Sequence, residues 1–219
     1  MKVLAVDAAL GRCSVTLVAD GELVTGRTRD GARGHPALLP AMVLNVLSEA
    51  GLAATCVDLV AVTVGPGSFT GIRAGLALAH GLGLGLGLPV IGVTVGEALA
   101  DSLASIGSRR VWSAIDSRRG RVFLERDGIV TAFVLDELPF PMRPIAVAGN
   151  AAVEVAARLA ARGADVMLTD ARLPVGRHIA RAAAQRHAGA LPPLAAEPLY
   201  VDPPEARLPA GGLRPAPCG

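Results

Sequence analysis

The sequence has few aromatic residues, few charges and few residues that bind metals. Of its 219 residues, 3% are aromatic and 18% are charged, whereas roughly 25% are charged in an average globular protein. Hydrophobic residues make up 52% of the chain, which excludes an intrinsically disordered protein. The core must therefore be aliphatic, and a surface that stacks nucleic-acid bases would have few rings to use.

The charge balance and the cysteine spacing argue against two further classes of protein, those that bind nucleic acid alone and those with a zinc ribbon. The net charge of +2 lacks the dense basic stripe of a chain that holds nucleic acid alone, so we expect any RNA contact to be shared with a partner. Cys13, Cys56 and Cys218 form no CxxC pair, which argues against a zinc ribbon. No signal peptide precedes the first strand, so we expect a cytoplasmic protein with reduced thiols. The four histidines form no HxxxH or HExxH pair, so we expect no metal site.

The first half of the chain predicts the element order β-β-β-α-β-α-β-α. Asp20-Gly21 is a strong hairpin signal, and apolar residues from Leu39 to Ala50 recur at helical spacing. The run 74–96 carries no charged residue and has the length of a membrane helix. Pro89 and the β-branched residues after it favour a buried helix and a strand instead, so we expect no membrane association. The predicted strands are 2–7, 13–19, 22–28, 59–64 and 90–95, and the helices are 35–50, 70–86 and 96–105.

The second half begins as the first half does. A strand at 111–116 ends in Asp116 as the strand at 2–7 ends in Asp7, and a second Asp-Gly pair follows at Asp127. This internal repeat predicts an α/β protein with a ribonuclease-H-like layered core and two lobes, the second smaller and degenerate. Further strands are predicted at 145–148 and 166–169, with second-lobe helices at 151–161 and 176–188. The predicted units are a first lobe at 1–106, a second lobe at 107–191, and a segment at 192–219 ending in a mobile tail rich in Pro and Gly.

The segment Gly65–Gly71 (GPGSFTG) connects a buried strand to a helix N-terminus, a place that favours anions. It matches neither a Walker loop nor a dinucleotide fingerprint nor a nucleophile elbow. Its candidate ligand-binding residues are Gly65, Gly67, Ser68 and Thr70. The alternative is a tight turn in which Ser68 or Thr70 caps the helix.

Asp7 and Asp116 close two related strands, where a two-lobed phosphotransferase would keep carboxylates for magnesium or water. Combined with the loop at 65–71, they define one functional alternative, an active hydrolase or kinase that binds ATP. Aspartates at strand ends are also common as caps and turn formers.

Five arginines cluster around the turn that follows Asp116. A cluster of cations on one loop can bind phosphate. The alternative is a solvated face or a surface for a protein partner. The residues are Arg109, Arg110, Arg118, Arg119 and Arg121.

The two predicted first-lobe helices at 35–50 and 70–86 are apolar around most of their circumference. A small lobe cannot bury every side of two such helices, which predicts a helix-on-helix contact with another subunit. Glycines four apart, at Gly71/Gly75 and Gly81/Gly85, would allow close backbone approach. The alternative is burial under the second lobe. The predicted interface residues are His35, Leu39, Met42, Val43, Val46, Gly71, Arg73, Gly75, Leu78 and Leu82.

Several segments resemble the TsaB (YeaZ) family, whose members are required for threonylcarbamoyladenosine in tRNA. The segments include VLAVDAALGRCSVTLVADGELV, VAVTVGPGSFTGIRAGLALAHGLGLGLGLPVIGV and SAIDSRRGRVF. The resemblance spans nearly the whole chain, and GPGSFTGIR with its flanking strand and helix is highly specific.

The resemblance implies an actin-like (ASKHA) fold with two lobes, without a complete active site or catalytic residues of its own. It implies a TsaD-like catalytic paralogue, a TsaE-like ATPase and, through the complex, tRNA as partners, with a homodimer through the first-lobe helices as a further form. ATP or ADP and a metal would belong to the partner subunits. His35 stands at the first of the two metal-binding histidines of the paralogue, and Leu39 stands at the second.

Overall fold

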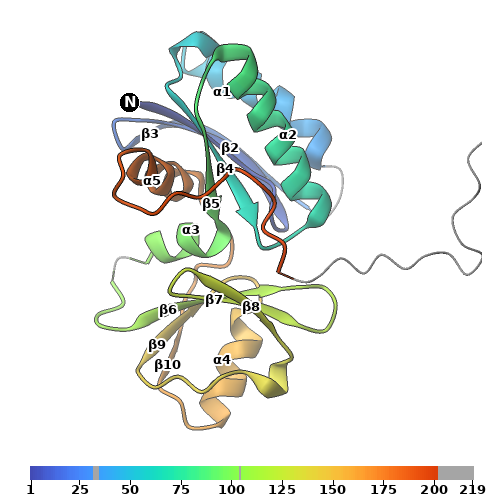
Figure 1. Ribbon diagram of the computed structural model, residues 1–219, viewed down its shortest axis with the longest axis vertical. Helices are drawn as coiled ribbons and strands as arrows, with labels where there is room; N and C mark the ends of the chain where they lie inside the picture. The colour runs from blue at the N-terminus through green and yellow to red at the C-terminus, as the bar shows by residue number, and fades with distance from the viewer. Residues whose placement is uncertain (32–34, 104, 202–219) are drawn as a thin grey trace, which may run out of the picture.

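The computed structural model has two lobes, each built on a five-stranded sheet (Figure 1). It describes residues 1–31, 35–103 and 105–201, and only the backbone of residues 35 and 36. The strand order is β3-β2-β1-β4-β5 in the first sheet and β10-β9-β6-β7-β8 in the second.

The first sheet combines an antiparallel meander with two parallel strands. Asp20 and Gly21 both have positive φ, as the predicted two-residue hairpin between β2 and β3 requires. Nearly all residues of β1 and β4 are buried, instead of every second one, because helices cover both faces of this sheet. The strands are β1 (Lys2–Asp7), β2 (Arg12–Ala19), β3 (Glu22–Asp30), β4 (Leu59–Gly65) and β5 (Val90–Thr94).

The second sheet has the same order and strand directions as the first. In each sheet, a strand that ends in an aspartate begins an antiparallel meander and also pairs in parallel with a later strand. The predicted internal repeat is therefore confirmed. The strands are β6 (Arg110–Asp116), β7 (Val122–Arg126), β8 (Ile129–Phe133), β9 (Ile145–Ala148) and β10 (Val166–Leu168).

Helices α1 (Leu39–Glu49) and α2 (Phe69–Leu86) lie on one side of the first sheet, and α3 (Val95–Asp101) lies between the lobes (Figure 1). Short 3-10 turns precede α1 at His35–Leu38 and occur at Ala54–Cys56 and Leu135–Glu137. The helix predicted at 96–105 ends earlier, at Asp101. Within the described residues, no helix combines the length and apolar character that a membrane crossing needs.

Helix α5 (Gly176–His187) differs from its predicted place in the second lobe, because it packs on the face of the first sheet opposite α1. Its apolar stripe includes Ile179 and Ala183, and these residues share a cluster with Val3 and Ala5 of β1. The second lobe keeps α4 (Ala152–Ala161). With α4 and its five-stranded sheet, the second lobe is smaller than the first.

The segment after α5 also packs against the first lobe. The backbone N–H of Leu199 donates to the Val64 carbonyl at 2.9 Å, and His80 Nε2 lies 2.7 Å from the Ala196 carbonyl oxygen. The part of the expected mobile tail up to Val201 is therefore packed against β4 and α2. The remainder of that predicted tail, 202–219, lies outside the described residues.

A buried carboxylate joins the two lobes. Glu125 of β7 is 6% exposed. It accepts hydrogen bonds from Thr94 Oγ1 at 2.6 Å and from the backbone N–H of Gly96 at 3.1 Å, at the start of α3. A Cβ atom on Gly96 would lie 2.2 Å from Glu125 Oε2, so only glycine leaves room for this carboxylate. Burial and, to a lesser extent, the nearby Glu97 carboxylate raise the pKa of Glu125 to about 7.

This carboxyl group makes stability depend on pH. The folded protein keeps the Glu125 proton up to about pH 7, whereas the unfolded chain loses it near the ordinary value of 4.5. The free energy of unfolding should therefore fall as pH rises through this window, by up to about 3 kcal/mol. Urea denaturation of Glu125→Gln should show a shallower pH slope than the parent protein. Burial also raises the pKa of Asp7, so part of the slope should remain.

Glu154→Gln, on an exposed position of α4, is the matched control and should keep the parental slope. An unchanged slope in Glu125→Gln would contradict the assignment.

Candidate functional site

The loop between β4 and α2 leads into the capped N-terminus of α2 and packs against the connection between β1 and β2. Ser68 is the N-cap of α2, because its Oγ accepts from the backbone N–H of Gly71 at 3.3 Å. The Ser68 N–H donates to the Ala9 carbonyl at 2.6 Å. Of the two predicted caps, Ser68 is therefore correct, whereas Thr70 lies exposed in the first turn of the helix.

Two glycines of this loop approach the backbone after β1 very closely. A Cβ atom on Gly67 would lie 2.1 Å from the Ala9 carbonyl oxygen, and one on Gly71 would lie 1.9 Å from that of Ala8. Both distances are far below contact distance, so no side chain fits at either position. Gly65 has φ +117°, a value that favours glycine. The glycine pattern of the loop thus serves a backbone-on-backbone contact.

Asp7 lies beneath this contact and is 0% exposed. Its Oδ1 accepts from Thr63 Oγ1 at 2.6 Å and from the Ala9 N–H at 3.0 Å. Among the described residues, its Oδ2 has no hydrogen-bond partner. Burial raises the pKa of this carboxyl group above its ordinary value. A reactant in solvent has no direct access to it.

Asp116 is exposed and is the last residue of β6, next to the β6–β7 turn. Its Oδ1 accepts from the Arg118 N–H at 2.7 Å, and its own N–H donates to Asn150 Oδ1 at 2.9 Å. It acts as a turn former in this position. The structure therefore does not present Asp7 and Asp116 to one ligand.

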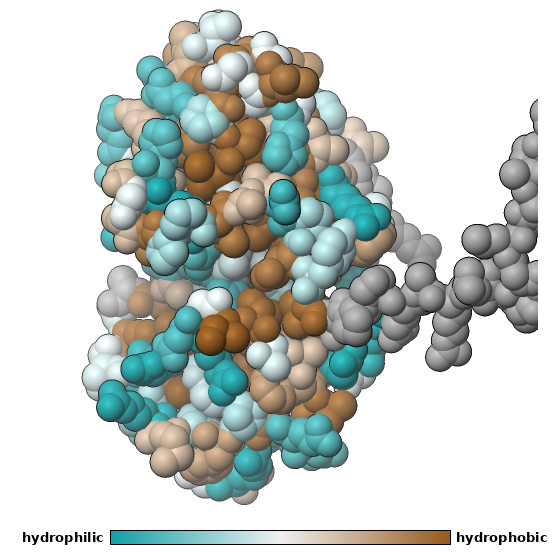
Figure 2. Space-filling view, in the orientation of Figure 1, coloured by the Kyte–Doolittle hydropathy of each residue, from teal (hydrophilic) through white to brown (hydrophobic). Residues whose placement is uncertain are grey.

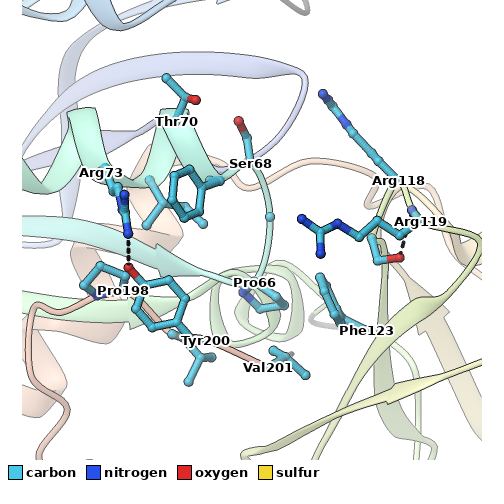
Figure 3. Close-up of a pocket in the computed structure, with 15 residues that line it drawn as sticks. Pro66, Ser68, Thr70, Arg73, Arg118, Arg119, Phe123, Pro198, Tyr200 and Val201 are labelled. Carbon is cyan, nitrogen blue, oxygen red and sulfur yellow. Dashed lines mark hydrogen bonds between the residues drawn. The ribbon is translucent and has the colours of Figure 1, made fainter. Parts of the chain in front are cut away.

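A cavity of about 790 Å³ opens between the lobes beside this loop. Figure 3 shows Arg118 and Arg119 extending from the β6–β7 turn toward the side that carries Ser68 and Thr70. None of the described residues that line the cavity is Asp or Glu. The lining consists of residues 66–70 with Ile72 and Arg73 of α2, residues 117–119 with Phe123 of β7, and residues 198–201. We call this cavity the interlobe cleft.

An aromatic and cationic stack forms one wall of the interlobe cleft. The guanidinium carbon of Arg73 lies 3.6 Å from the ring centroid of Phe69 and 5.8 Å from that of Tyr200. Arg73 also donates to the Tyr200 hydroxyl at 2.7 Å (Figure 3). The sequence pattern pointed to Arg73 but to neither ring. Tyr200 lies 127 positions from Arg73, and no local pattern signals such a contact. Phe69 lies one helical turn before Arg73 in α2, at a spacing that places two side chains side by side.

The described part of the interlobe cleft offers no carboxylate for a magnesium nucleotide. Mg²⁺ is usually held by one or two carboxylates together with substrate phosphates, but none of the described lining residues is Asp or Glu, and Asp7 is buried. Within the described ranges, no three His, Cys, Asp or Glu side chains gather in a group that could hold a metal. Leu39, at the position of the second paralogue histidine, is a fully buried core residue.

Most of the predicted interface residues face inward. Leu39, Met42, Val43 and Val46 are buried in the cluster between α1 and β1–β2, which corrects their assignment to a partner surface. The cause is the apolar face of β2, which α1 covers. Gly71 and Gly75 are also buried, Leu78 and Leu82 are half-buried, and Arg73 lies in the interlobe cleft. The side chain of His35 lies outside the description.

A different face of the same helices is exposed and apolar. Leu44 of α1 is 69% exposed and Leu84 of α2 is 89% exposed. Gly81 and Gly85 have no atom within 4 Å of an added Cβ. We give the name outer helix face to six exposed residues of α1 and α2, which are Ala41, Leu44, Ala77, Gly81, Leu84 and Gly85. Figure 2 shows apolar atoms on the first lobe and at the waist between the lobes.

The predicted arginine cluster is divided in the structure. Arg109 pairs with Asp165 at 2.6 Å and Arg110 with Asp127 at 2.8 Å, so both are engaged on the second lobe. Arg118 and Arg119 line the interlobe cleft, and Arg121 does not.

Residues 29–163 match the model of the family described as TsaD, tRNA N6-adenosine threonylcarbamoyltransferase. The chain is 40% identical over 124 residues to the tRNA threonylcarbamoyladenosine biosynthesis protein TsaB of Escherichia coli, covering 56% of this chain and 53% of that protein. It is 35% identical over 127 residues to TsaB of Haemophilus influenzae, covering 58% and 53% respectively. The matched region therefore spans about half the length of these curated relatives.

Solved structures support the same relationship over more of the chain. YeaZ from Pseudomonas aeruginosa superposes with a TM-score of 0.75 at 27% identity, covering 91% of this chain and 99% of that one. Component A of the (R)-2-hydroxyglutaryl-CoA dehydratase of Acidaminococcus fermentans superposes with a TM-score of 0.53 at 10% identity, over 86% of this chain and 99% of that one, which supports the fold alone. The predicted actin-like architecture is confirmed.

The loop contact generates a stability prediction with a control on the same helix. Gly71→Ala should lower the free energy of unfolding by about 1–3 kcal/mol or more, because the added methyl group overlaps the Ala8 carbonyl. Gly81→Ala should raise it by up to about 1 kcal/mol, because its methyl group meets open space and alanine favours the helix. Chemical denaturation measures both. Equal effects of the two substitutions would show that the loop does not need the close approach.

Proposed function

The chain belongs to the family of TsaD, tRNA N6-adenosine threonylcarbamoyltransferase, and is similar to its TsaB (YeaZ) members; from this membership we propose that it is a non-catalytic partner subunit of a TsaD-like transferase. The reaction of that transferase forms N6-threonylcarbamoyladenosine in tRNA, 3′ of the anticodon. The proposed complex also includes a TsaE-like ATPase. ATP or ADP and the metal are assigned to those partner subunits.

The outer helix face is the observation that carries the partner role. Leu84 is 89% exposed near the C-terminal end of α2, and Gly81 and Gly85 of the same helix are exposed as well. Exposed leucines in a contiguous apolar area are typical of interaction sites. A stable interface of standard size buries about 800 Å² on each partner, and two exposed helix faces side by side are a suitable basis for that area.

The small residues on α2 favour a helix as the contacting element. Gly81 and Gly85 are four residues apart, hence on one side of the helix, and an added Cβ at either meets open space. A partner helix could therefore approach the α2 backbone closely, as small residues allow at tightly packed helix pairs. The TsaD-like paralogue is the proposed occupant in the active complex, and a second copy of this chain is the proposed occupant when the paralogue is absent.

The carboxylate geometry supports a role without catalysis. The functional alternative, an actin-like hydrolase or kinase, requires Asp7 and Asp116 to act on one bound nucleotide. Asp7 is fully buried, and the Asp116 carboxylate accepts from the Arg118 N–H within its own turn. No specific contact in the described residues favours that alternative.

The proposal predicts that one charge on the outer helix face prevents association. Leu84→Glu should lower the affinity for the TsaD-like paralogue by a factor of ten or more, because the carboxylate would be buried without a partner at the interface. The monomer should keep its stability, since Leu84 is almost fully exposed. Solution molar mass of the mixture measures the association.

Met142→Glu is the control, because Met142 is 93% exposed on the second lobe; this variant should associate normally. Normal association of Leu84→Glu would contradict this interface. Gly75→Leu is unsuitable as a test, because a Cβ atom added to the buried Gly75 would already lie 3.7 Å from Val62 Cγ2, so the rest of a leucine side chain would disturb the core.

A further inference from the structure

A second cavity, of about 550 Å³, lies between the lobes and has the Glu125 carboxyl group in its lining. Glu125 belongs to β7 of the second lobe, whereas its two hydrogen-bond donors, Thr94 and Gly96, lie at the end of β5 and in the first turn of α3. Ser113 of β6 contacts the same place, because its Oγ donates to the Gly96 carbonyl at 3.4 Å. One ionisable group thus makes two hydrogen bonds across the lobe boundary.

The surroundings of Glu125 suit the neutral carboxylic acid. Its side chain belongs to a residue that is 6% exposed, and burial disfavours the charged form. Thr94 is the N-cap of α3, and its Oγ1 accepts from the Glu97 N–H at 2.9 Å. A hydroxyl oxygen has two acceptor positions, so Thr94 Oγ1 can also accept the proton of a neutral Glu125 across the same 2.6 Å.

The charged residues around Glu125 do not compensate its ionisation. Glu97 of α3 carries a like charge, and Arg186 of α5 pairs with Glu97. Arg110 of β6 pairs with Asp127 at 2.8 Å. These four are the other charged residues in the described lining of the cavity. An ionised Glu125 therefore adds a buried negative charge beside Glu97 and beside two arginines that already have carboxylate partners.

The lobes are connected so that they can part at this boundary. The chain passes between them twice in the fold, from α3 to β6 and from β10 to α5. Movement of two lobes about a few connecting residues is a common form of domain opening. Apolar residues from both sides, among them Leu99 and Ile115, share one cluster. That cluster keeps the lobes joined when the polar contacts of Glu125 break.

We propose that Glu125 is a latch between the lobes that its proton controls: the neutral acid holds β7 on the start of α3, and the carboxylate releases this contact and takes up water in the second cavity. The proton passes to solvent, and no other reactant is needed. The inference concerns the position of the lobes and does not depend on the proposed function.

The latch sets the direction of the pH effect. The closed boundary keeps the Glu125 proton up to about pH 7, whereas a hydrated glutamate releases it near 4.5. The open form therefore binds fewer protons, and opening is favoured as the pH rises. By linkage, the equilibrium constant for opening should rise about tenfold between pH 6 and pH 8.

A thiol placed at the boundary measures this opening. Ser113→Cys is nearly isosteric, and Ser113 is 2% exposed, so its thiol reacts with iodoacetamide only when the boundary opens. Cys13, which is 0% exposed in the first-lobe core, reports unfolding of that lobe in the same molecule. Peptide mass spectrometry gives both rates, and each is divided by the rate of an unstructured cysteine peptide at the same pH.

The thiol at position 113 should react faster than Cys13, and its normalised rate should rise about tenfold from pH 6 to pH 8. Adding Glu125→Gln, which keeps the shape of the neutral acid, should hold the change within about twofold. Adding Glu154→Gln, on an exposed position of α4, is the matched control and should keep the tenfold rise.

Two results overturn the latch. The first is a thiol at position 113 that reacts no faster than Cys13, because the boundary then opens only when the first lobe unfolds. The second is an undiminished rise in Glu125→Gln. If Ser113→Cys does not fold, hydrogen exchange of the Gly96 N–H in the parent protein replaces it. The protection of this N–H, which Glu125 holds at 3.1 Å, should fall by the same factor, and a pH-independent protection overturns the latch as well.

Discussion

The contact between the loop at 65–71 and the backbone of Ala8 and Ala9 is the constraint on which the functional surfaces depend. Gly67 and Gly71 have no room for a side chain, and Ser68 both caps α2 and donates to the Ala9 carbonyl. This contact fixes where α2 starts, and so positions the helix that carries the outer helix face. Asp7 accepts from the Ala9 N–H next to this contact and is 0% exposed, so the carboxylate that an actin-like phosphotransferase would use is closed off from solvent.

The second constraint joins the lobes. Glu125 of β7 enters the start of α3, next to Glu97, which pairs with Arg186 of α5. Elements of both lobes thus share one buried polar cluster. A buried carboxyl group with a pKa near neutrality costs stability when it ionises.

Several features followed from local sequence. The Asp-Gly hairpins, the strand–loop–helix unit around Ser68 and the repeat that relates Asp7 to Asp116 all depend on short-range geometry, and the strand order confirms the repeat. The predicted interface residues of α1 are buried in the core, so they cannot form a partner surface, whereas a contact through the outer faces of α1 and α2 stays a prediction. Periodicity identified the buried stripe of α1, with Leu39 and Val46, whereas Leu44 on the opposite side is exposed. An apolar helix pattern does not state which apolar side faces the sheet.

By itself, the sequence determined the element types, the two-lobed repeat and the family, because turn chemistry, hydrophobic period and a specific glycine motif are written in neighbouring residues. Only the tertiary structure decided that α5 packs on the first lobe and that Asp7 is sealed. It alone placed Arg73, Arg118 and Tyr200 around one cavity. These outcomes depend on contacts between residues far apart in the chain, and such contacts are selected by shape and burial, which no local pattern encodes.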